Sequence, residues 1–265
     1  MNIIQAIILG ITQGLTEFIP VSSSGHLVFM HHILGVYGSE LAFDVALHIG
    51  TLLALVVVFY KDIWELFLGL LGKNDKRKLA ILLIIATVPA VISGVLLEKA
   101  AESTFRSVRL VAVDMMAAAF IMLWAENFAK KRKNRTKLEN TKTKQAIIIG
   151  LAQAAAVVPG ISRSGATITA GLFAGMDRVA ATRFSFLLAI PITTGAILKV
   201  LADGGGLAQG NGQTGLVVVG IVSAFLSGLF AIKFLLNYLA KHSLSVFAYY
   251  RIAVGLAAIA IVTIR

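Results

Sequence analysis

Cysteine is absent from the 265 residues, and charged side chains make up only 14% of them. The missing thiols exclude disulfides, thiolate catalysis and cysteine-ligated metals, and they leave the cellular compartment open. Acidic residues are scarcer than basic ones, with 13 Asp and Glu against 24 Lys and Arg. Hydrophobic residues account for 58%, and the mean hydropathy is +0.87. This composition lies outside the soluble globular range and predicts a membrane protein.

Six apolar stretches are each long enough to cross a bilayer, which takes roughly 20 helical residues. The first eleven residues have no basic start and no small-residue cleavage site, so we expect no cleavable signal peptide. The sequence therefore predicts an all-α polytopic membrane protein, folded as a single membrane domain over residues 1–265. The predicted spans lie at about 41–60, 79–97, 108–128, 179–201, 216–237 and 246–264.

The net charge of +11 is distributed unevenly between the predicted loops. Lys and Arg gather in the loops at 61–78 and 130–144, whereas the first 40 residues and the loop at 202–215 contain none. Threading the six spans places both basic loops on one face, which the positive-inside rule assigns to the cytoplasm. The glycine-rich 203–215 segment then forms a flexible external loop. Charge placed in this way argues against a nucleic-acid partner.

A short sequence occurs twice in the chain, 140 positions apart. QAIILGITQ at 5–13 returns as QAIIIGLAQ at 145–153, and SSSG at 22–25 returns as SRSG at 162–165. We interpret the protein as two related halves, each with one interrupted apolar segment and three full spans. Because three is odd, the second half enters the membrane from the opposite side, which makes an inverted-topology repeat. The predicted halves cover about 1–135 and 136–265.

Each copy of the repeat is interrupted by a proline just before its serines, at Pro20 and Pro159. Pro20 disfavours helix at Ile19, and the serines that follow are good caps for a new helix beginning near Gly25. The second copy restarts in the same way near Gly165. Two re-entrant helical hairpins, one from each face, would bring two helix N-termini together near the midplane. Their free N–H groups and dipole ends form an anion site.

The two copies differ in the side chains that can carry chemistry. Gln13 and Glu17 lie four residues apart on one helix face, and a carboxylate at bilayer depth costs roughly 2.5–3.5 kcal/mol, so it must be paired or bound. His26 follows Ser23 by three residues, so both can share a face. Arg163 has a planar guanidinium suited to bidentate phosphate binding. The competing interpretations are a structural Glu17–Arg163 bridge and a packing role for His26.

These groups together form a phosphoryl-transfer constellation within reach of lipid. In the favoured mechanism Ser23 attacks a phosphorus, with His26 as its general base or as acid to the leaving group. Glu17, with Gln13, holds a divalent cation or orients His26, while Arg163 stabilises charge on the phosphoryl oxygens. In the alternative mechanism, a metal-activated water attacks the phosphorus in place of Ser23. The further phosphate-contacting candidates, which could equally be helix caps, are Ser22, Ser24, Ser162, Ser164 and Thr167.

Other polar residues receive structural interpretations at this stage. His31, His32 and His48 are interpreted as interfacial or packing residues, and Arg251 as an anchor at the cytoplasmic end of the last span. The rival function is a lipid or anion transporter, or flippase, because inverted re-entrant repeats are also a transporter architecture. Such a carrier needs an anion site but no nucleophile with a base, so Ser23 favours an enzyme.

The two motifs resemble the signatures of a known family. QGLTEFIPVSSSGH at 13–26 and PGISRSGAT at 159–167, with FAYYR at 247–251, are similar to the bacterial undecaprenyl-pyrophosphate phosphatases of the bacitracin-resistance type. The resemblance covers the whole chain. It implies hydrolysis of undecaprenyl pyrophosphate to undecaprenyl phosphate and inorganic phosphate, which recycles the carrier lipid of cell-wall synthesis.

The resemblance also implies a setting and a set of site residues. It implies a divalent cation, Mg²⁺ or Ca²⁺, and a bacterial inner-membrane protein whose site opens to the outer side. A polyprenyl pyrophosphate lipid is the implied substrate partner, and a dimer is an assembly that it allows. Position 13 is Glu in some members and Gln here, which weakens a site built on two carboxylates. The residues that match the family's active site are Glu17, Ser23, His26 and Arg163.

Overall fold

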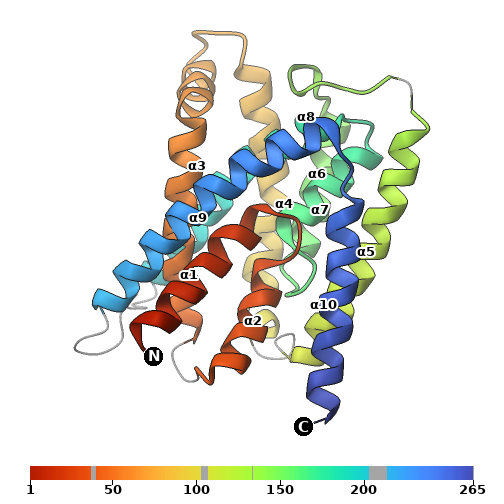
Figure 1. The fold of residues 1–265 in the computed structure, drawn as a ribbon. Coiled ribbons are helices and arrows are strands. Elements are labelled where there is room, and N and C mark those ends of the chain that lie inside the picture. Colours follow the sequence, from red (N-terminus) through yellow and green to blue (C-terminus); the bar gives the residue numbers. More distant parts are fainter. Residues whose placement is uncertain (37–39, 103–106, 133, 203–213, 265) are drawn as a thin grey trace.

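The computed structural model describes residues 1–36, 40–102, 107–132, 134–202 and 214–264, and the regular elements within these ranges are all helical (Figure 1). The prediction of an all-α protein is therefore confirmed. The α-helices are α1 (Ile3–Phe18), α2 (Ser23–Leu34), α3 (Glu40–Leu70), α4 (Arg77–Glu102), α5 (Val108–Lys130), α6 (Thr143–Ala155), α7 (Arg163–Phe173), α8 (Arg178–Ala202), α9 (Thr214–Lys241) and α10 (Ser245–Ile264), with a short 3₁₀ helix at Leu138–Asn140.

Six of the described helices are long and apolar enough to cross a membrane, namely α3, α4, α5, α8, α9 and α10. Each overlaps one of the six predicted stretches, so the multi-pass prediction is confirmed. The main difference is α3, which continues to Leu70 although its apolar stretch was expected to end at residue 60. Its backbone leaves helical geometry at Phe59 (φ −105°, ψ 19°), and the next turns extend beyond the predicted span.

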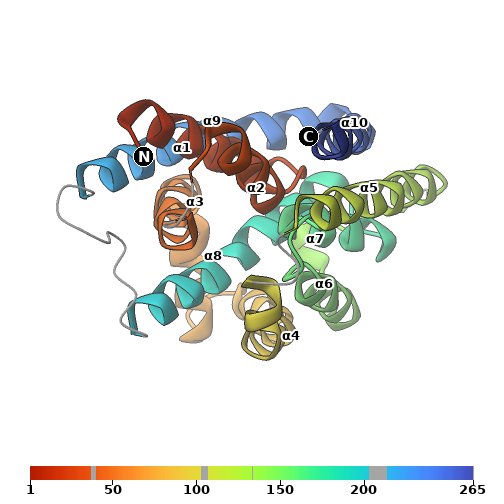
Figure 2. The ribbon, with the colours of Figure 1, turned by 90° about the horizontal axis from the view of Figure 1, so that it is seen from below.

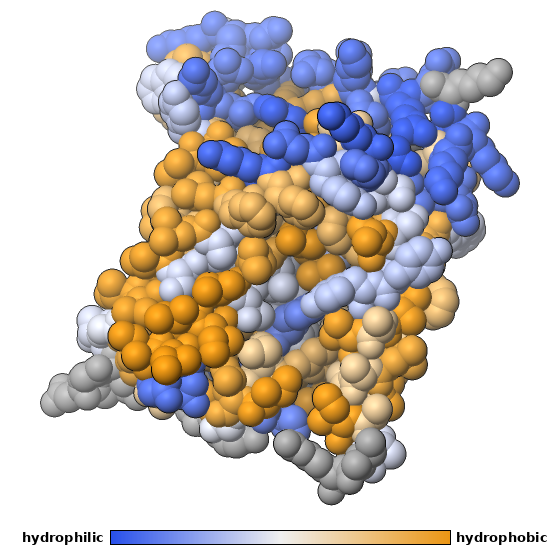
Figure 3. Space-filling model, in the orientation of Figure 1, coloured by the Kyte–Doolittle hydropathy of each residue, from blue (hydrophilic) through white to orange (hydrophobic). Residues whose placement is uncertain are grey.

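The ends of the molecule differ in polarity. The α3–α4 and α5–α6 connections lie at one end, and both termini lie at the other (Figure 1). Hydrophilic residues gather at the first of these ends, while apolar residues cover most of the body below it (Figure 3). This arrangement agrees with the threading of the basic loops onto one face. Of the predicted external loop at 203–215, residues 203–213 lie outside the described residues.

The two short helix pairs have their breaks at the predicted prolines. α1 ends at Phe18 and α2 begins at Ser23, because Ile19 is extended (φ −63°, ψ 131°) before Pro20. α6 and α7 form the second pair. We call residues 13–26 and 153–166 the first and second hairpin tips. Whether the pairs re-enter the bilayer from opposite faces stays a prediction, as does the division into halves.

Repeated side chains hold each pair in the same way. The side-chain amide of Gln5 donates to the carbonyl of Leu34 at 3.1 Å, and Gln145 donates to Ala174 at 3.0 Å. Each bond joins the start of the first helix to the end of the second. The two motifs found 140 residues apart in the sequence therefore produce the same local link in space.

Small residues let each pair approach a long helix closely. A Cβ on Gly10 would lie 2.5 Å from the carbonyl oxygen of Gly220 in α9, and one on Gly150 would lie 2.6 Å from that of Ala86 in α4. Such contacts allow only glycine at these positions. Seen from below, α1 lies along α9 on one side of the molecule and α6 along α4 on the other, with α7 between them (Figure 2).

Candidate active site

Both hairpin tips are closed by a serine in an unusual backbone conformation. Ser22 (φ 76°) and Ser162 (φ 73°) are the non-glycine residues with positive φ in the described part of the chain. The hydroxyl of Ser22 accepts the N–H of Gly25 at 3.2 Å, and that of Ser162 accepts the N–H of Gly165 at 3.1 Å. Strained backbone of this kind persists where the surroundings fix it, commonly at functional sites. The two serines cap the N-termini of α2 and α7.

Glu17 lies at the centre of the polar groups that the sequence singled out. Its Oε2 accepts from the Ser23 hydroxyl at 2.5 Å and from the side-chain amide of Gln13 at 3.1 Å. Its Oε1 accepts from the guanidinium of Arg163, which comes from the second hairpin. Gln13 is fully buried and Glu17 is 7% exposed. The structure thus brings four of the predicted site residues into direct contact.

Two polar atoms in this cluster have no hydrogen-bond partner among the described residues. They are Oε1 of Gln13 and Nη1 of Arg163, both buried. Buried polar atoms in folded proteins are rarely left unpaired, so each of these two calls for an explanation such as a catalytic role, a water or an ion. The purely structural interpretation of the Glu17–Arg163 bridge accounts for one guanidinium nitrogen and leaves the other unexplained. A ligand oxygen at Nη1 would explain it.

His48 is a neighbour of the cluster that sequence reasoning missed. Its Nε2 lies 3.8 Å from Oε2 of Glu17, while its Nδ1 donates to the carbonyl of Asp44 at 2.8 Å. The side chain is about one-third exposed. Nothing in the sequence indicates that α3 passes beside the end of α1, so the pairing had no signal. His31, by contrast, is buried against Asp44 at 2.8 Å, in agreement with its predicted packing role.

His26 is oriented differently from the favoured mechanism. Its Nδ1 bonds to the carbonyl oxygen of Ser22 at 2.8 Å, and its Nε2 pairs with the hydroxyl of Tyr250 at 2.9 Å. Among the described residues, no hydrogen bond joins His26 to Ser23. The hydroxyl of Ser23 instead bonds to Glu17. The carboxylate is therefore the group placed to take the serine proton.

The interpretation of Arg251 as an anchor at the membrane surface is wrong, because its side chain is completely buried. Its guanidinium donates to the carbonyls of Gly160 at 2.8 Å, Ile161 at 3.0 Å and Met115 at 3.1 Å. A basic residue near a span end commonly reaches for the surface, which motivated the prediction. Here the broken helix at the second tip leaves carbonyls without partners, and Arg251 supplies the donors.

The five remaining phosphate-contacting candidates occupy different positions. Ser22 and Ser162 act as helix caps, and each hydroxyl lies 3.3–3.4 Å from that of the serine two residues on, Ser24 or Ser164. Ser24 is exposed, whereas Ser164 is buried. Thr167 is fully buried, with its hydroxyl bonded to the Arg163 carbonyl at 2.8 Å and to Ser185 at 2.6 Å. The caps explain most of these hydroxyls without a ligand.

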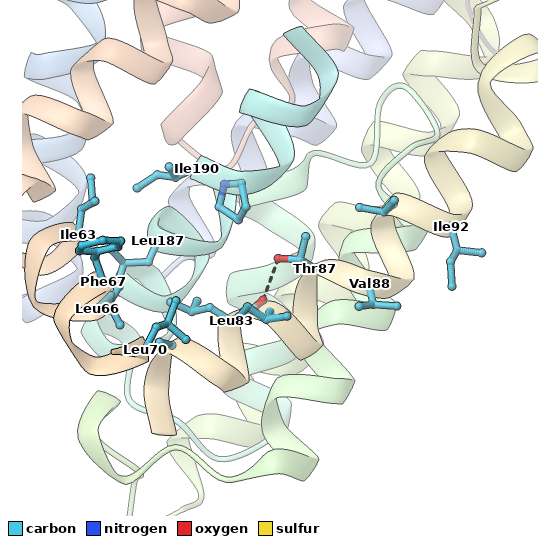
Figure 4. A pocket seen from close by; sticks show the side chains of 14 residues that line it. Ile63, Leu66, Phe67, Leu70, Leu83, Thr87, Val88, Ile92, Leu187 and Ile190 are labelled. Atoms are coloured by element: carbon cyan, nitrogen blue, oxygen red, sulfur yellow. Dashed lines mark hydrogen bonds between the residues drawn. The ribbon is translucent and has the colours of Figure 1, made fainter. Parts of the chain in front are cut away.

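The described residues also form two surface cavities outside this cluster. The larger, of about 460 Å³, lies between α3, α4 and α8 and is lined by apolar side chains and Thr87 (Figure 4). Thr87 donates to the Leu83 carbonyl at 2.8 Å, so the proton of the one polar side chain lining this cavity is already bonded. The second, of about 300 Å³, lies between α5, α6 and α7 and is lined in part by Gly165, Thr169 and Arg251.

The donors around Glu17 limit what metal ion could bind. No group of three or more His, Cys, Asp and Glu suited to a metal occurs among the described residues. Gln13 directs its amide nitrogen at Glu17 and has a buried, unpaired Oε1, so the carboxylate and this amide oxygen are the protein oxygens that a cation could take. Mg²⁺ commonly binds through one or two protein oxygens and takes its other ligands from phosphates and water. The residues fit such a cation and do not fit a metal site made entirely of protein groups.

Comparison with known proteins agrees with the motifs. Residues 6–257 match the family described as bacitracin resistance protein BacA. The chain is 41% identical to an undecaprenyl-diphosphatase of Moorella thermoacetica over 267 residues, covering all of both chains. Identity is 41% to that of Thermodesulfovibrio yellowstonii (94% and 93% covered) and 42% to that of Halothermothrix orenii (97% and 96% covered). The chain therefore belongs to the BacA family of bacitracin resistance proteins.

Proposed function

We propose that this protein is a membrane phosphatase that hydrolyses undecaprenyl pyrophosphate to undecaprenyl phosphate and inorganic phosphate. The full-length relatives named undecaprenyl-diphosphatases support this activity. The observation that carries it is the contact between the Ser23 hydroxyl and the Glu17 carboxylate at 2.5 Å, beside an Arg163 nitrogen that has no hydrogen-bond partner in the described part of the chain. A nucleophile (Ser23), a proton acceptor (Glu17) and a guanidinium that can bind phosphate (Arg163) thus lie together.

Ser23 is the nucleophile in this proposal, and Glu17 accepts its proton. The hydroxyl oxygen of Ser23 attacks the terminal phosphorus, and the bridging oxygen leaves with undecaprenyl phosphate. A water molecule then attacks the phosphoserine, and the proton held by Glu17 returns to the serine oxygen as the phosphate departs. In the alternative mechanism, an activated water attacks the substrate directly, and the same carboxylate acts as its base.

Arg163 and the two helix N-termini stabilise the charge that develops on the phosphoryl oxygens. One guanidinium nitrogen of Arg163 stays on Glu17, and the unpartnered Nη1 binds an oxygen of the terminal phosphate. His26 is assigned to the leaving oxygen rather than to Ser23; its Nδ1 is held by the Ser22 carbonyl, so a protonated Nε2 that exchanges its bond to Tyr250 is the atom that would donate to that oxygen. Ser24 and Ser164, near the two caps, are further donors to the diphosphate.

Glu17 and Gln13 are the residues that would hold a divalent cation, Mg²⁺ or Ca²⁺. The cation would neutralise charge on the diphosphate. Gln13 is neutral, and Glu17 already pairs with Arg163, so the protein itself contributes little negative charge to such an ion. The diphosphate must therefore supply most of the cation's charged ligands.

The location that fits this activity is the bacterial inner membrane, with the basic loops in the cytoplasm. A site that opens to the outer side would receive the lipid where it is released from cell-wall synthesis. The substrate's polyprenyl chain would lie among the apolar helices. A dimer stays a prediction. The transporter alternative has no support among the relatives, which are named as diphosphatases.

Phosphate release by purified protein tests the proposal. We expect detergent-purified protein to release inorganic phosphate from a polyprenyl pyrophosphate, and Ser23→Ala to lower kcat by about a thousandfold or more. Ser93→Ala is the matched control, because the Ser93 hydroxyl donates to the Ala90 carbonyl of its own helix and makes no other hydrogen bond with the described residues. No release by the wild type would refute the activity. Unchanged release by Ser23→Ala would refute the serine mechanism and leave the activated water.

A further inference from the structure

Two adjacent residues of α10 reach different hairpin tips. Tyr250 bonds to His26, which belongs to the first pair of helices, and Arg251 bonds to Gly160 and Ile161 in the second. Consecutive residues of an α-helix point about 100° apart, since 3.6 residues make a turn. One helix can therefore contact both tips through neighbouring side chains.

The contact of Tyr250 fixes the orientation of His26, while the Ser22 carbonyl sets its tautomer. A backbone carbonyl can only accept, so Nδ1 of His26 carries the proton that it donates to Ser22. In the neutral imidazole, Nε2 then accepts from the hydroxyl of Tyr250. The two ring planes lie within 3° of each other, with centroids 5.6 Å apart. A partner on the second nitrogen commonly sets which proton state a histidine presents.

The contact of Arg251 fixes the backbone that precedes Arg163. Its Nη2 donates to the carbonyls of Gly160 and Ile161, and its Nε donates to Met115 in α5. Gly160 has a φ of +100°, so this stretch cannot satisfy its carbonyls as a helix would. The guanidinium is completely buried and ties the second tip to both α10 and α5.

We propose that Tyr250 and Arg251 act as positioning residues that hold the two hairpin tips in register. This inference rests on the proposed phosphatase function. His26 and Arg163 come from different hairpins, so the distance between them depends on what joins the tips. The Glu17–Arg163 bridge is one such link, and the adjacent pair on α10 is a second. A displacement of about 1 Å in a catalytic group can cost a hundredfold in rate.

The first test compares Tyr250→Phe with Tyr249→Phe. Tyr249 is the preceding residue of the same helix, and its hydroxyl makes no hydrogen bond among the described residues, so it is the matched control. We expect Tyr250→Phe to lower kcat about tenfold, the worth of one lost hydrogen bond, without changing KM or the melting temperature. Tyr249→Phe should keep wild-type kinetics. Equal kinetics for the two variants and the wild type would overturn the role of Tyr250.

The second test uses Arg251→Lys, with competitive inhibition by inorganic pyrophosphate as the readout. A lysine ammonium replaces the guanidinium fork by a single point of charge, so it cannot reproduce all three carbonyl contacts. We expect pyrophosphate to inhibit about tenfold more weakly, because the backbone before Arg163 is less well held. Wild-type inhibition in the folded variant would overturn the role of Arg251. Arg251→Gln, which keeps one donor group, provides a second variant if the lysine protein does not fold.

The two tests separate this inference from the proposed function. A structural role alone would lower the melting temperature and affect kcat and pyrophosphate binding together in both variants. The positioning role predicts a split, with kcat affected at Tyr250 and pyrophosphate binding affected at Arg251. If the wild type releases no phosphate, the proposed function fails, and the effect of Arg251→Lys on direct pyrophosphate binding still decides the second half of the inference.

Discussion

The two hairpin tips have the same backbone frame and different side chains. Each has a serine cap at a φ near 75° and a glycine three residues later whose N–H the serine accepts. At the offset of 140 residues, Glu17 corresponds to Val157, Ser23 to Arg163 and His26 to Ala166. The first tip therefore carries the proposed nucleophile, Ser23, together with Glu17 and His26. The second tip carries the positively charged guanidinium of Arg163.

This difference shows how a duplicated element can be specialised. The shared frame supplies what any anion site needs, namely helix N-termini with free N–H groups. The reactive groups are then divided, so that neither tip contains a complete site. Glu17 and Arg163 meet only because the two tips meet. The chemistry is therefore a property of the interface between the hairpins, and the following predictions test that division.

Among the variants of the second tip, Arg163→Lys should lower kcat/KM the most. Lysine cannot keep one nitrogen on Glu17 and place another on a phosphoryl oxygen in the same fixed plane. We expect kcat/KM for polyprenyl pyrophosphate to fall about a hundredfold in a protein that keeps its helical circular dichroism. Arg183→Lys is the control, because Arg183 pairs with Asp62 at 2.6 Å outside the site. A normal kcat/KM in Arg163→Lys would show that Arg163 is only a structural partner of Glu17.

Gln13→Glu adds a second carboxylate to the first tip and so increases the difference in charge between the two tips. Gln13 contacts Glu17 at 3.1 Å, so a glutamate there raises the negative charge around any bound cation. We expect the Mg²⁺ concentration for half-maximal activity to fall about tenfold. EDTA should abolish the activity of the wild type, and added Mg²⁺ or Ca²⁺ should restore it. Full activity after chelation would remove the cation from the proposal.

The sequence predicted most of the fold because its strongest signals are local. Apolar length identified the six spans, and proline before serine identified both breaks. Residues brought together by tertiary packing carried no such signal. His48 has ordinary helix neighbours in the sequence, yet α3 places it 3.8 Å from Glu17. Arg251 was interpreted as a surface anchor because the sequence does not show that the carbonyls of Gly160 and Ile161 face α10.

The relation between Ser23 and His26 shows a second limit of sequence reasoning. A spacing of three residues places two side chains on one helix face, which suggested a nucleophile with its base. The carbonyl of Ser22, one turn back, instead bonds to Nδ1 of His26. Glu17 comes from the other side of the tip and bonds to the Ser23 hydroxyl. The spacing predicted which side chains lie at the tip, but the pairing among them depends on the fold of the tip.

The smallest predicted effects concern the part that the two tips share. Replacing Ser22 or Ser162 by alanine removes a cap and should lower stability by about 1 kcal/mol in each case. Glycine at the same positions should cost only a few tenths of a kcal/mol, because it adopts positive φ without strain. Thermal unfolding in detergent should therefore rank wild type, glycine and alanine in the same order at both tips. A marked loss at Ser22 with little loss at Ser162 would contradict an equivalent frame, and would indicate that Arg251 holds the second tip without its cap.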